Sequence, residues 1–159
     1  MPQLSLHSPV GDLTVTEEDG KIISLDWGWV PGEWQSVTPL LENARDQLNR
    51  YFDGEIGDFD LPLYPPGTEF QKKVWAEMRK ISAGQTKSYG EIAKILKSAA
   101  QPVGTACGAN PIPILIPCHR ILGAGGKIGG YSGDGGVETK IALLRLEKAL
   151  PAAQQSFDI

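Results

Sequence analysis

A proline-rich stretch near the middle of the chain divides it into two parts. Residues 57–70, GDFDLPLYPPGTEF, hold prolines at positions 62, 65 and 66 and show no regular hydrophobic period. Because proline fixes φ and lacks a backbone donor, we expect neither a helix nor a central strand to run through this stretch. We therefore predict one domain over residues 1–66, a second over residues 67–150 and a disordered tail over residues 151–159.

The pattern before this boundary is typical of an antiparallel sheet followed by a helix. Residues 13–27, LTVTEEDGKIISLDW, contain two strand-like runs joined at Asp19-Gly20, a dipeptide suited to a hairpin turn because glycine accepts positive φ. Residues 38–52, TPLLENARDQLNRYF, place apolar side chains near helical spacing. Gly54 lies just past their end, where a C-cap belongs.

After the boundary the pattern is mostly helical. Thr68 precedes an apolar stripe over residues 70–78 and is placed to cap it. Ser88 stands three residues before Glu91, which is the spacing of a capping box, and a third short helix is expected within residues 99–110. Two short helices with a tight connection suggest a helix-turn-helix, although any small helical bundle would show the same pattern.

The two parts of the chain carry opposite charge. Residues 1–67 hold 3 basic and 12 acidic side chains, a net charge of −9, whereas residues 68–150 hold 12 basic and 6 acidic ones, a net charge of +6. A basic part within an acidic chain suggests a surface for a polyanion. A solvated basic face would give the same charge, so both interpretations stay open.

The inventory of residues argues against a zinc site, a membrane span and secretion. Two cysteines and two histidines are too few for a Cys/His zinc site. No apolar run is long enough to cross a bilayer, and residues 1–13 lack the basic and apolar segments of a secretory signal. We therefore expect a cytoplasmic protein without a disulfide.

Residues 116–121, IPCHRI, concentrate the most chemistry in the shortest stretch. The prolines and aliphatic residues before them favour an extended segment that ends near Cys118. Adjacent side chains of an extended chain point to opposite faces, so the expected link between Cys118 and His119 is a bridging water. The alternative is an inert buried thiol, which is what most free cysteines are.

Glu147 changes the balance between these alternatives. On a helical wheel it falls between Leu143 and Leu144, in the middle of an apolar stripe. A buried carboxylate needs a partner, and the two candidates are His119 and Lys140. If the carboxylate orients a histidine, the histidine can polarise a water beside the thiol. That arrangement favours the reactive thiolate. A purely structural pair between Glu147 and Lys140 is the other interpretation.

With these residues in place, the chain resembles the methylated-DNA–protein-cysteine methyltransferases, also called O6-alkylguanine-DNA alkyltransferases. The resemblance covers nearly the whole chain and rests on NRYFDGE, GTEFQKKVW, SYGEIA, NPIPILIPCHRI, GGYSG and LLRLE at the spacings of the family. It implies an α/β plus α fold: a small ribonuclease-H-like N-terminal domain with an antiparallel sheet, then a winged helix-turn-helix domain that binds the DNA minor groove.

The resemblance assigns the chemistry to five residues. It implies that Cys118 attacks the alkyl carbon on O6 of guanine, or on O4 of thymine, and keeps the group in a single turnover. His119 would take the thiol proton through a water, and Glu147 would orient that imidazole. Asn110 would stabilise the turn that holds the site, and Tyr89 would help to rotate the nucleotide outward and donate a proton toward guanine N3.

The resemblance also implies the pocket and the DNA surface. The flipped base would be received by Tyr131, Ser132, Pro113 and Gly129. DNA would be contacted by Ala100, Gln101, Lys97 and Arg120, with Lys87 and Lys94 as further candidates for phosphates, although Arg120 has a structural role as its alternative. The base has to leave the stack because a protein sulfur cannot approach an O6-alkyl group inside a duplex.

DNA that contains O6-alkylguanine is the implied partner, and a monomer is expected. No metal or organic cofactor is needed, because proton donation neutralises the leaving guanine. Two other functions are weighed against this one. A non-enzymatic alkyltransferase-like protein would bind the lesion and signal, but such proteins lack the acceptor cysteine. A winged-helix regulator would leave the buried Glu147 and the PCHR run without a role.

One position departs from the pattern of the family. Where the family has an arginine that occupies the space left by the flipped base, this chain has Gln101, followed by Pro102. Glutamine lacks the cationic fork, so we expect weaker flipping in duplex DNA. Proline suits the first helical turn, so the helix is expected to begin at or just before Pro102. The loop over residues 131–140 is also longer than is usual in the family, which bears on the size of the pocket and on the alkyl group that it accepts.

Overall fold

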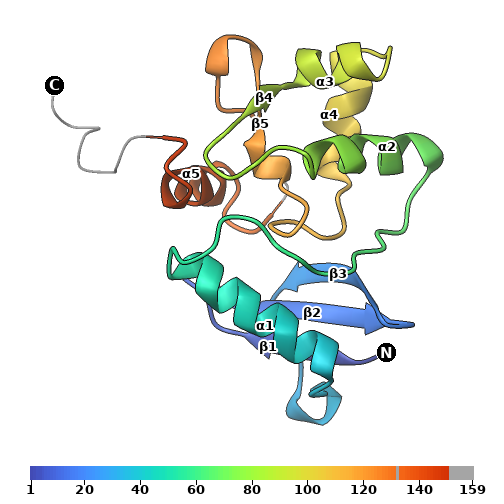
Figure 1. The fold of residues 1–159 in the computed structure, drawn as a ribbon, viewed down its shortest axis with the longest axis vertical. Coiled ribbons are helices and arrows are strands. Elements are labelled where there is room, and N and C mark those ends of the chain that lie inside the picture. Colours follow the sequence, from blue (N-terminus) through green and yellow to red (C-terminus); the bar gives the residue numbers. More distant parts are fainter. Residues whose placement is uncertain (132, 151–159) are drawn as a thin grey trace, which may run out of the picture.

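The N-terminal part is a three-stranded antiparallel sheet with a helix packed against it (Figure 1). The computed structural model describes residues 1–131 and 133–150. Its strands lie in the order β1-β2-β3, with bounds β1 (Gln3–Leu6), β2 (Leu13–Glu18) and β3 (Lys21–Trp27). A short 3-10 helix, η1 (Gly32–Trp34), precedes helix α1 (Pro39–Phe52), which packs on β1 and β2. The predicted antiparallel sheet and helix are confirmed.

The turn between β2 and β3 and the two ends of α1 are explained by their local sequence. Asp19 and Gly20 join β2 to β3 with φ of 51° and 76°. Thr38 caps α1, because its hydroxyl accepts a hydrogen bond from the backbone N–H of Leu41 at 3.1 Å. Gly54 has a φ of 79° just past the end of α1, a left-handed conformation that glycine adopts without strain.

Three helices pack together in the C-terminal part. They are α2 (Glu69–Met78), α3 (Tyr89–Ile95) and α4 (Ala100–Gly108). Both predicted caps are confirmed, since α2 and α3 begin with capping boxes at Thr68 and Ser88. Helix α4 packs on both α2 and α3, and the α3–α4 pair forms the predicted helix-turn-helix. Since α4 begins at Ala100, Pro102 lies in its first turn, as expected.

The segment before the cysteine is a compact turn, which corrects the prediction of an extended chain. The Asn110 side chain accepts from the backbone N–H of Ile112 and donates to the carbonyl of Ile116, both at 2.9 Å. Ile114 has a φ of 73°, which is rare for a β-branched residue. The prediction was wrong because these side-chain bonds satisfy the backbone locally and remove the need for a strand partner.

Cys118 begins a 3-10 helix, η2 (Cys118–Arg120), rather than ending a strand. Strand β5 (Ile121–Leu122) follows and pairs in parallel with β4 (Lys87–Ser88). A short 3-10 helix, η3 (Ala124–Gly126), leads toward the last helix, α5 (Val137–Leu146). Glu147 is the C-cap of α5 and so lies at the end of the helix, not within it, yet its side chain is only 1% exposed.

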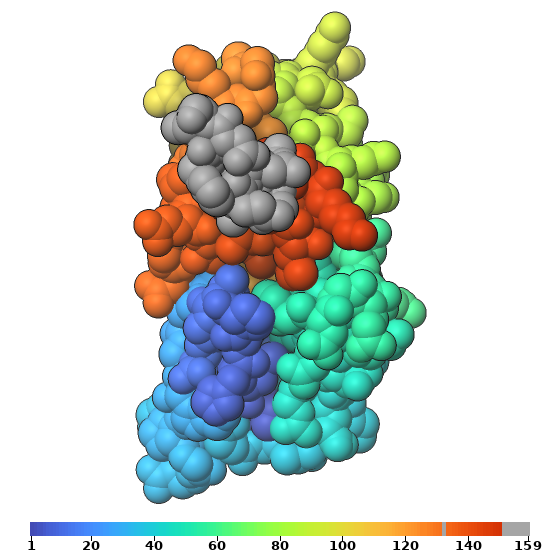
Figure 2. All heavy atoms as spheres, turned by 90° about the vertical axis from the view of Figure 1, so that its left-hand side faces the viewer, coloured from blue at the N-terminus to red at the C-terminus, as the bar shows by residue number. Residues whose placement is uncertain are grey.

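The two parts of the chain are in direct contact, and α5 lies at their boundary (Figures 1 and 2). The backbone N–H of Leu25 in β3 donates to the carbonyl of Pro111 at 3.0 Å, which ties the sheet to the turn before Cys118. One cluster of buried apolar side chains extends through both parts. Within the described residues, no helix is long and apolar enough to span a membrane.

Candidate active site

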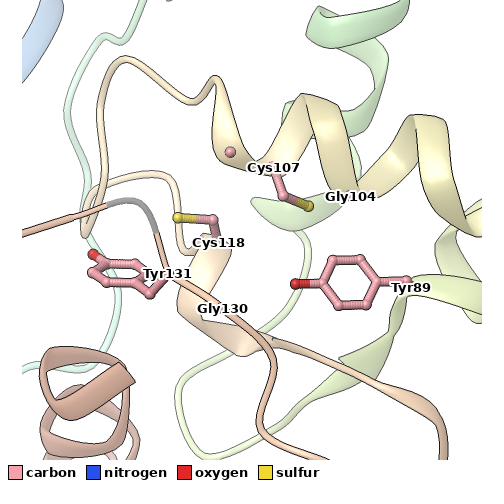
Figure 3. A pocket seen from close by; sticks show the side chains of 7 residues that line it. Tyr89, Gly104, Cys107, Cys118, Gly130 and Tyr131 are labelled. Atoms are coloured by element: carbon pink, nitrogen blue, oxygen red, sulfur yellow. The ribbon is translucent and has the colours of Figure 1, made fainter. Parts of the chain in front are cut away.

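Cys118 lines a cavity of about 290 Å³ in the C-terminal part (Figure 3). Helices α3 and α4, η2 and the segment before α5 supply the walls, whose residues are Tyr89, Gly104, Cys107, Gly108, Cys118, Gly130 and Tyr131. The volume is near the lower end of the range found for small-ligand sites. The structure therefore brings Cys118, Tyr89 and Tyr131, three of the predicted site residues, around one cavity.

The Cys118 thiol is nearly covered, since only 5% of the residue is exposed. Burial raises the pKa of this thiol, because the thiolate loses its hydration. The Asn110 side chain and the Lys140 ammonium act in the opposite direction. A thiol in this environment needs a proton acceptor close by if it is to react as the thiolate.

His119, the next residue along the chain, is the candidate for that acceptor. It is fully buried, and its Nε2 lies 2.7 Å from Oε2 of Glu147. The carboxylate favours the tautomer with the proton on Nε2, and Nδ1 has no hydrogen-bond partner among the described residues. Burial lowers the pKa of His119, although Glu147 opposes that shift. A neutral imidazole with an available Nδ1 lone pair is the form that a general base requires.

Glu147 is held on both of its oxygens. Arg120 Nε donates to Oε1 at 2.9 Å and Nη2 to Oε2 at 3.0 Å, while the Tyr51 hydroxyl donates to Oε2 at 2.5 Å. Burial alone would raise the pKa of this carboxyl, but the hydrogen bonds from His119 and Arg120 hold it at about 2. Glu147 is therefore an ionised carboxylate at neutral pH.

Lys140 is not the partner of Glu147, so the alternative interpretation, a structural pair between these two residues, is wrong. Its Nζ donates to the carbonyl of Ile121 at 2.7 Å and to that of Gly130 at 3.3 Å. Of the two candidates that the sequence offered for Glu147, the structure selects His119. Lys140 instead links β5 to the segment that lines the cavity.

Arg120 was predicted to contact DNA, and its position contradicts this. The residue is 2% exposed, and its guanidinium also donates to Asp58 at 2.9 Å and to the carbonyl oxygens of Gly57 and Ile81 at 3.0 and 2.5 Å. Each of its three nitrogens has an acceptor within the protein, so none is available to a phosphate. The alternative, a structural role, agrees with these contacts.

Two phenols face the cavity. Tyr89 is the first residue of α3 and directs its hydroxyl toward the segment that carries Cys118 and Tyr131 (Figure 3). Burial raises the pKa of Tyr89 above its usual value, so the phenol stays protonated and can donate. The Tyr131 ring contacts Trp27 of β3 edge-on, with ring centroids 6.3 Å apart. Its buried hydroxyl has no hydrogen-bond partner in the part of the chain that is described.

The available chemistry is that of a thiol, a base and phenolic donors. Cys118 offers a nucleophile, the His119–Glu147 pair a proton acceptor, and Tyr89 a proton donor. Over residues 1–131 and 133–150, no group of three or more His, Cys, Asp or Glu side chains is arranged to hold a metal ion.

Comparison with known proteins identifies the family. The sequence model described as "6-O-methylguanine DNA methyltransferase, ribonuclease-like domain" matches residues 4–65, and that described as "6-O-methylguanine DNA methyltransferase, DNA binding domain" matches residues 69–149. The chain belongs to the 6-O-methylguanine DNA methyltransferase family. The methylated-DNA–protein-cysteine methyltransferase of Mycobacterium tuberculosis is 42% identical over an alignment of 162 positions, gaps included, that covers 97% of each chain. That of Methanosarcina acetivorans is 42% identical over an alignment that covers 89% of this chain and 94% of its own.

Solved structures of this methyltransferase family have the same fold. The structure of Mycobacterium tuberculosis OGT in complex with DNA matches 99% of this chain and 100% of its own, with a TM-score of 0.84 and 42% identity. The O6-methylguanine methyltransferase of the same organism gives a TM-score of 0.81 at 41% identity, with 99% of each chain covered. The predicted fold class, a ribonuclease-like domain followed by a DNA-binding helical domain, is confirmed.

The remaining pocket residues implied by the methyltransferase family lie at different places. A Cβ on Gly129 would lie 3.2 Å from the Tyr89 hydroxyl, so this glycine borders the cavity closely. Pro113 instead lines a neighbouring cleft of about 460 Å³, together with Trp27 and Asp134, which corrects its assignment to the Cys118 pocket. Ser132 lies outside the described residues, as does the predicted disordered tail.

The residues expected to contact DNA, apart from Arg120, lie around the helix-turn-helix. Ala100 and Gln101 are exposed at the start of α4, and Lys97 is exposed in the turn before it. Lys94 is exposed on α3, whereas Lys87 in β4 is half-buried. Helix α4 itself carries no charged residue, so cationic side chains flank it rather than cover it.

Three contributors to the site were not predicted from the sequence. Tyr51 was assigned only to the apolar stripe of its helix, and its partner lies 96 residues later. Asp58 is in the proline-rich stretch, where nothing marks it as a partner of Arg120. Cys107 faces the cavity from α4, and burial raises its pKa to about 12, so it is a neutral thiol. No local pattern distinguishes these residues from ordinary core or surface positions.

Proposed function

We propose that this protein repairs DNA by transferring an alkyl group from O6 of guanine to Cys118 in a single, irreversible turnover. One observation carries the assignment to Cys118. The thiol lines a cavity of about 290 Å³, and the adjacent His119 is bonded to a buried carboxylate at 2.7 Å. A thiol that only filled space would need neither a cavity nor a charged partner behind its neighbour.

The proposed reaction is one displacement at carbon. The Cys118 proton passes through a water to Nδ1 of His119, and Glu147 stabilises the imidazolium that results. The thiolate then forms a bond to the alkyl carbon while the bond from that carbon to guanine O6 breaks. The electron pair of the broken bond stays on guanine, and Tyr89 donates toward N3 to neutralise it. The product is a thioether on Cys118 and an unmodified guanine.

The turn before Cys118 keeps the nucleophile in place during this step. Asn110 holds the turn through two buried hydrogen bonds, at 2.9 Å each, and we propose that this is its role. A nucleophile that is pre-positioned loses little entropy on reaction. The same turn is bonded to β3 through Pro111, so the sheet supports the position of the thiol.

DNA that contains O6-alkylguanine is the proposed partner. The base would leave the stack and enter the cavity between Tyr89 and Tyr131, because the thiol cannot reach it in a duplex. The exposed start of α4, with Ala100, Gln101 and the nearby Lys97, is the proposed contact surface. We further propose that the protein acts as a monomer in the cytoplasm, with the domain boundary at residues 66 and 67.

Intact-mass measurement tests this function. After incubation with an oligonucleotide that contains O6-methylguanine, the protein should gain the mass of one methylene unit, and peptide mapping should place the methyl group on Cys118. Cys118→Ala should show no gain. A methyl group on Cys107, or an unchanged mass in spite of DNA binding, would contradict the proposal and would favour a protein that only binds the lesion.

A further inference from the structure

Tyr51 connects the N-terminal part to the acceptor site. It lies near the end of α1 and is 1% exposed, and its ring packs against Phe52 and Phe59 at centroid distances of 5.1 and 5.0 Å. Its hydroxyl lies 2.5 Å from Oε2 of Glu147. Apolar packing accounts for the ring, but it does not account for a hydroxyl directed at the one carboxylate that holds His119.

Tyr51 and His119 share a single acceptor atom. Oε2 of Glu147 accepts from the Tyr51 hydroxyl and from Nε2 of His119, the latter at 2.7 Å. A phenol that donates to a carboxylate oxygen draws negative charge away from it. That oxygen then stabilises the imidazolium less than an oxygen without the phenol would. The contact therefore bears on how readily His119 holds a proton.

We propose that Tyr51 is a positioning residue of the acceptor site, through which the N-terminal part fixes Glu147 and limits the basicity of His119. The inference rests on the proposed function, since it takes His119 as the group that receives the Cys118 proton. It gives the acidic N-terminal part, which carries no reactive residue of the site, a share in the reaction.

The effect of Tyr51 on His119 and Glu147 can be tested without changing the other groups that face these two residues. The charged and titratable groups around His119 and Glu147 are Arg120 and Cys118 in η2, Lys140 in α5, Tyr131 before α5, and Asp58, which is reached through Arg120. Burial raises the pKa of Tyr51, and Glu147 raises it further, so this phenol remains a neutral donor across the pH range of interest. Replacing Tyr51 with phenylalanine thus removes one donor and no charge.

Histidine-selective NMR provides a direct test, because the chain has only two histidines. In Tyr51→Phe the pKa of His119 should rise by about 0.5 to 1, a three- to tenfold change in its protonation equilibrium. The exposed His7 provides an internal reference in each sample. Tyr64→Phe is the matched control, because Tyr64 is 54% exposed and should leave His119 unchanged. A His119 pKa that is unchanged or lower in Tyr51→Phe would overturn the proposal.

The rate of methyl transfer gives a second readout. His119 has to be neutral to accept a proton, so a raised pKa slows transfer about three- to tenfold below the midpoint and leaves the plateau at higher pH unchanged. Equal slowing at every pH would mean that Tyr51 only supports the fold, which contradicts the proposal. If wild-type protein transferred no methyl group, the proposed function would fail, whereas the NMR titration would still decide the inference.

Fluorination at position 51 covers the case in which Tyr51→Phe does not fold. A 3-fluorotyrosine keeps the hydroxyl and makes it a stronger donor, so the pKa of His119 should fall rather than rise. The same substitution at Tyr64 should have no effect, since that side chain is exposed. A rise in the His119 pKa, or no change, with fluorotyrosine at position 51 would also overturn the proposal.

Discussion

Arg120 contacts both oxygens of Glu147: Nε lies 2.9 Å from Oε1, and Nη2 lies 3.0 Å from Oε2. The two side chains are 3% and 1% exposed, so this is a buried, two-point ion pair. It fixes the plane of the carboxylate, and the same carboxylate orients His119. In the proposed reaction, the run from Cys118 to Arg120 would supply the nucleophile, the base, and the arginine that holds the carboxylate partner of that base.

Loss of this ion pair should destabilise the protein strongly. Arg120→Met leaves Glu147 buried with less compensation and removes the bonds to Asp58, Gly57 and Ile81, so we expect a loss of about 3 to 5 kcal/mol in the free energy of unfolding. Urea denaturation measures this loss. Arg79→Met, at an exposed position, is the control and should change stability by less than about 0.5 kcal/mol. Equal effects of the two substitutions would contradict the structural role of Arg120.

Stability should fall in acid through Glu147. Its pKa is lowered from 4.5 to about 2 in the folded protein, which corresponds to about 3 kcal/mol of stabilisation. A depressed folded pKa stabilises the protein above the pKa of the unfolded chain, and this stability is lost as the pH falls toward about 2. The stability gap between wild type and Glu147→Gln should therefore be largest near neutral pH and narrow in acid. A gap that stayed constant from about pH 7 to about pH 3 would be inconsistent with this expectation.

Features with local signals were predictable from the sequence, and features with distant partners were not. The caps at Thr68 and Ser88 were predictable because each cap is defined within four residues of chain. The pairing of Glu147 with His119 was one of two options, and only the fold could choose between His119 and Lys140. Tyr51 could not be foreseen as a donor, since its acceptor lies 96 residues away.

Arg120 shows the limit of assigning a residue by its type. A basic side chain in a basic region reads as a surface contact, because arginine is rarely buried without a partner. Here its acceptors come from three distant places: Glu147 after α5, Asp58 in the proline-rich stretch, and the carbonyl of Ile81 after α2. Each acceptor alone is unremarkable in the sequence. The fold brings these acceptors together around Arg120, and for this reason the side chain is buried and does not lie on the surface as a phosphate ligand.

Gly133 should be sensitive to the smallest possible side chain. A Cβ at this position would collide with the Tyr131 ring and would lie 2.7 Å from the Trp27 ring, so Gly133→Ala has to displace one of them. Because Tyr131 lines the cavity, its displacement should slow methyl transfer by about tenfold or more, measured in a single turnover. Gly32→Ala is the control, since no atom lies within 4 Å of a Cβ there. Unchanged transfer by Gly133→Ala would show that the position of Tyr131 does not limit the reaction.

Gln101 should limit the delivery of the base from duplex DNA. It is exposed at the second position of α4, on the proposed contact surface for DNA, but an amide supplies neither the charge nor the planar fork of an arginine. Gln101→Arg should therefore raise the single-turnover rate on duplex substrate by about tenfold, or about 1.4 kcal/mol in the barrier, and leave the rate on single strands nearly unchanged. Gln101→Lys is the matched control, because it adds the charge without the fork. If wild type and Gln101→Arg each repaired duplex and single-stranded substrate at the same rate, flipping would not be the limiting step.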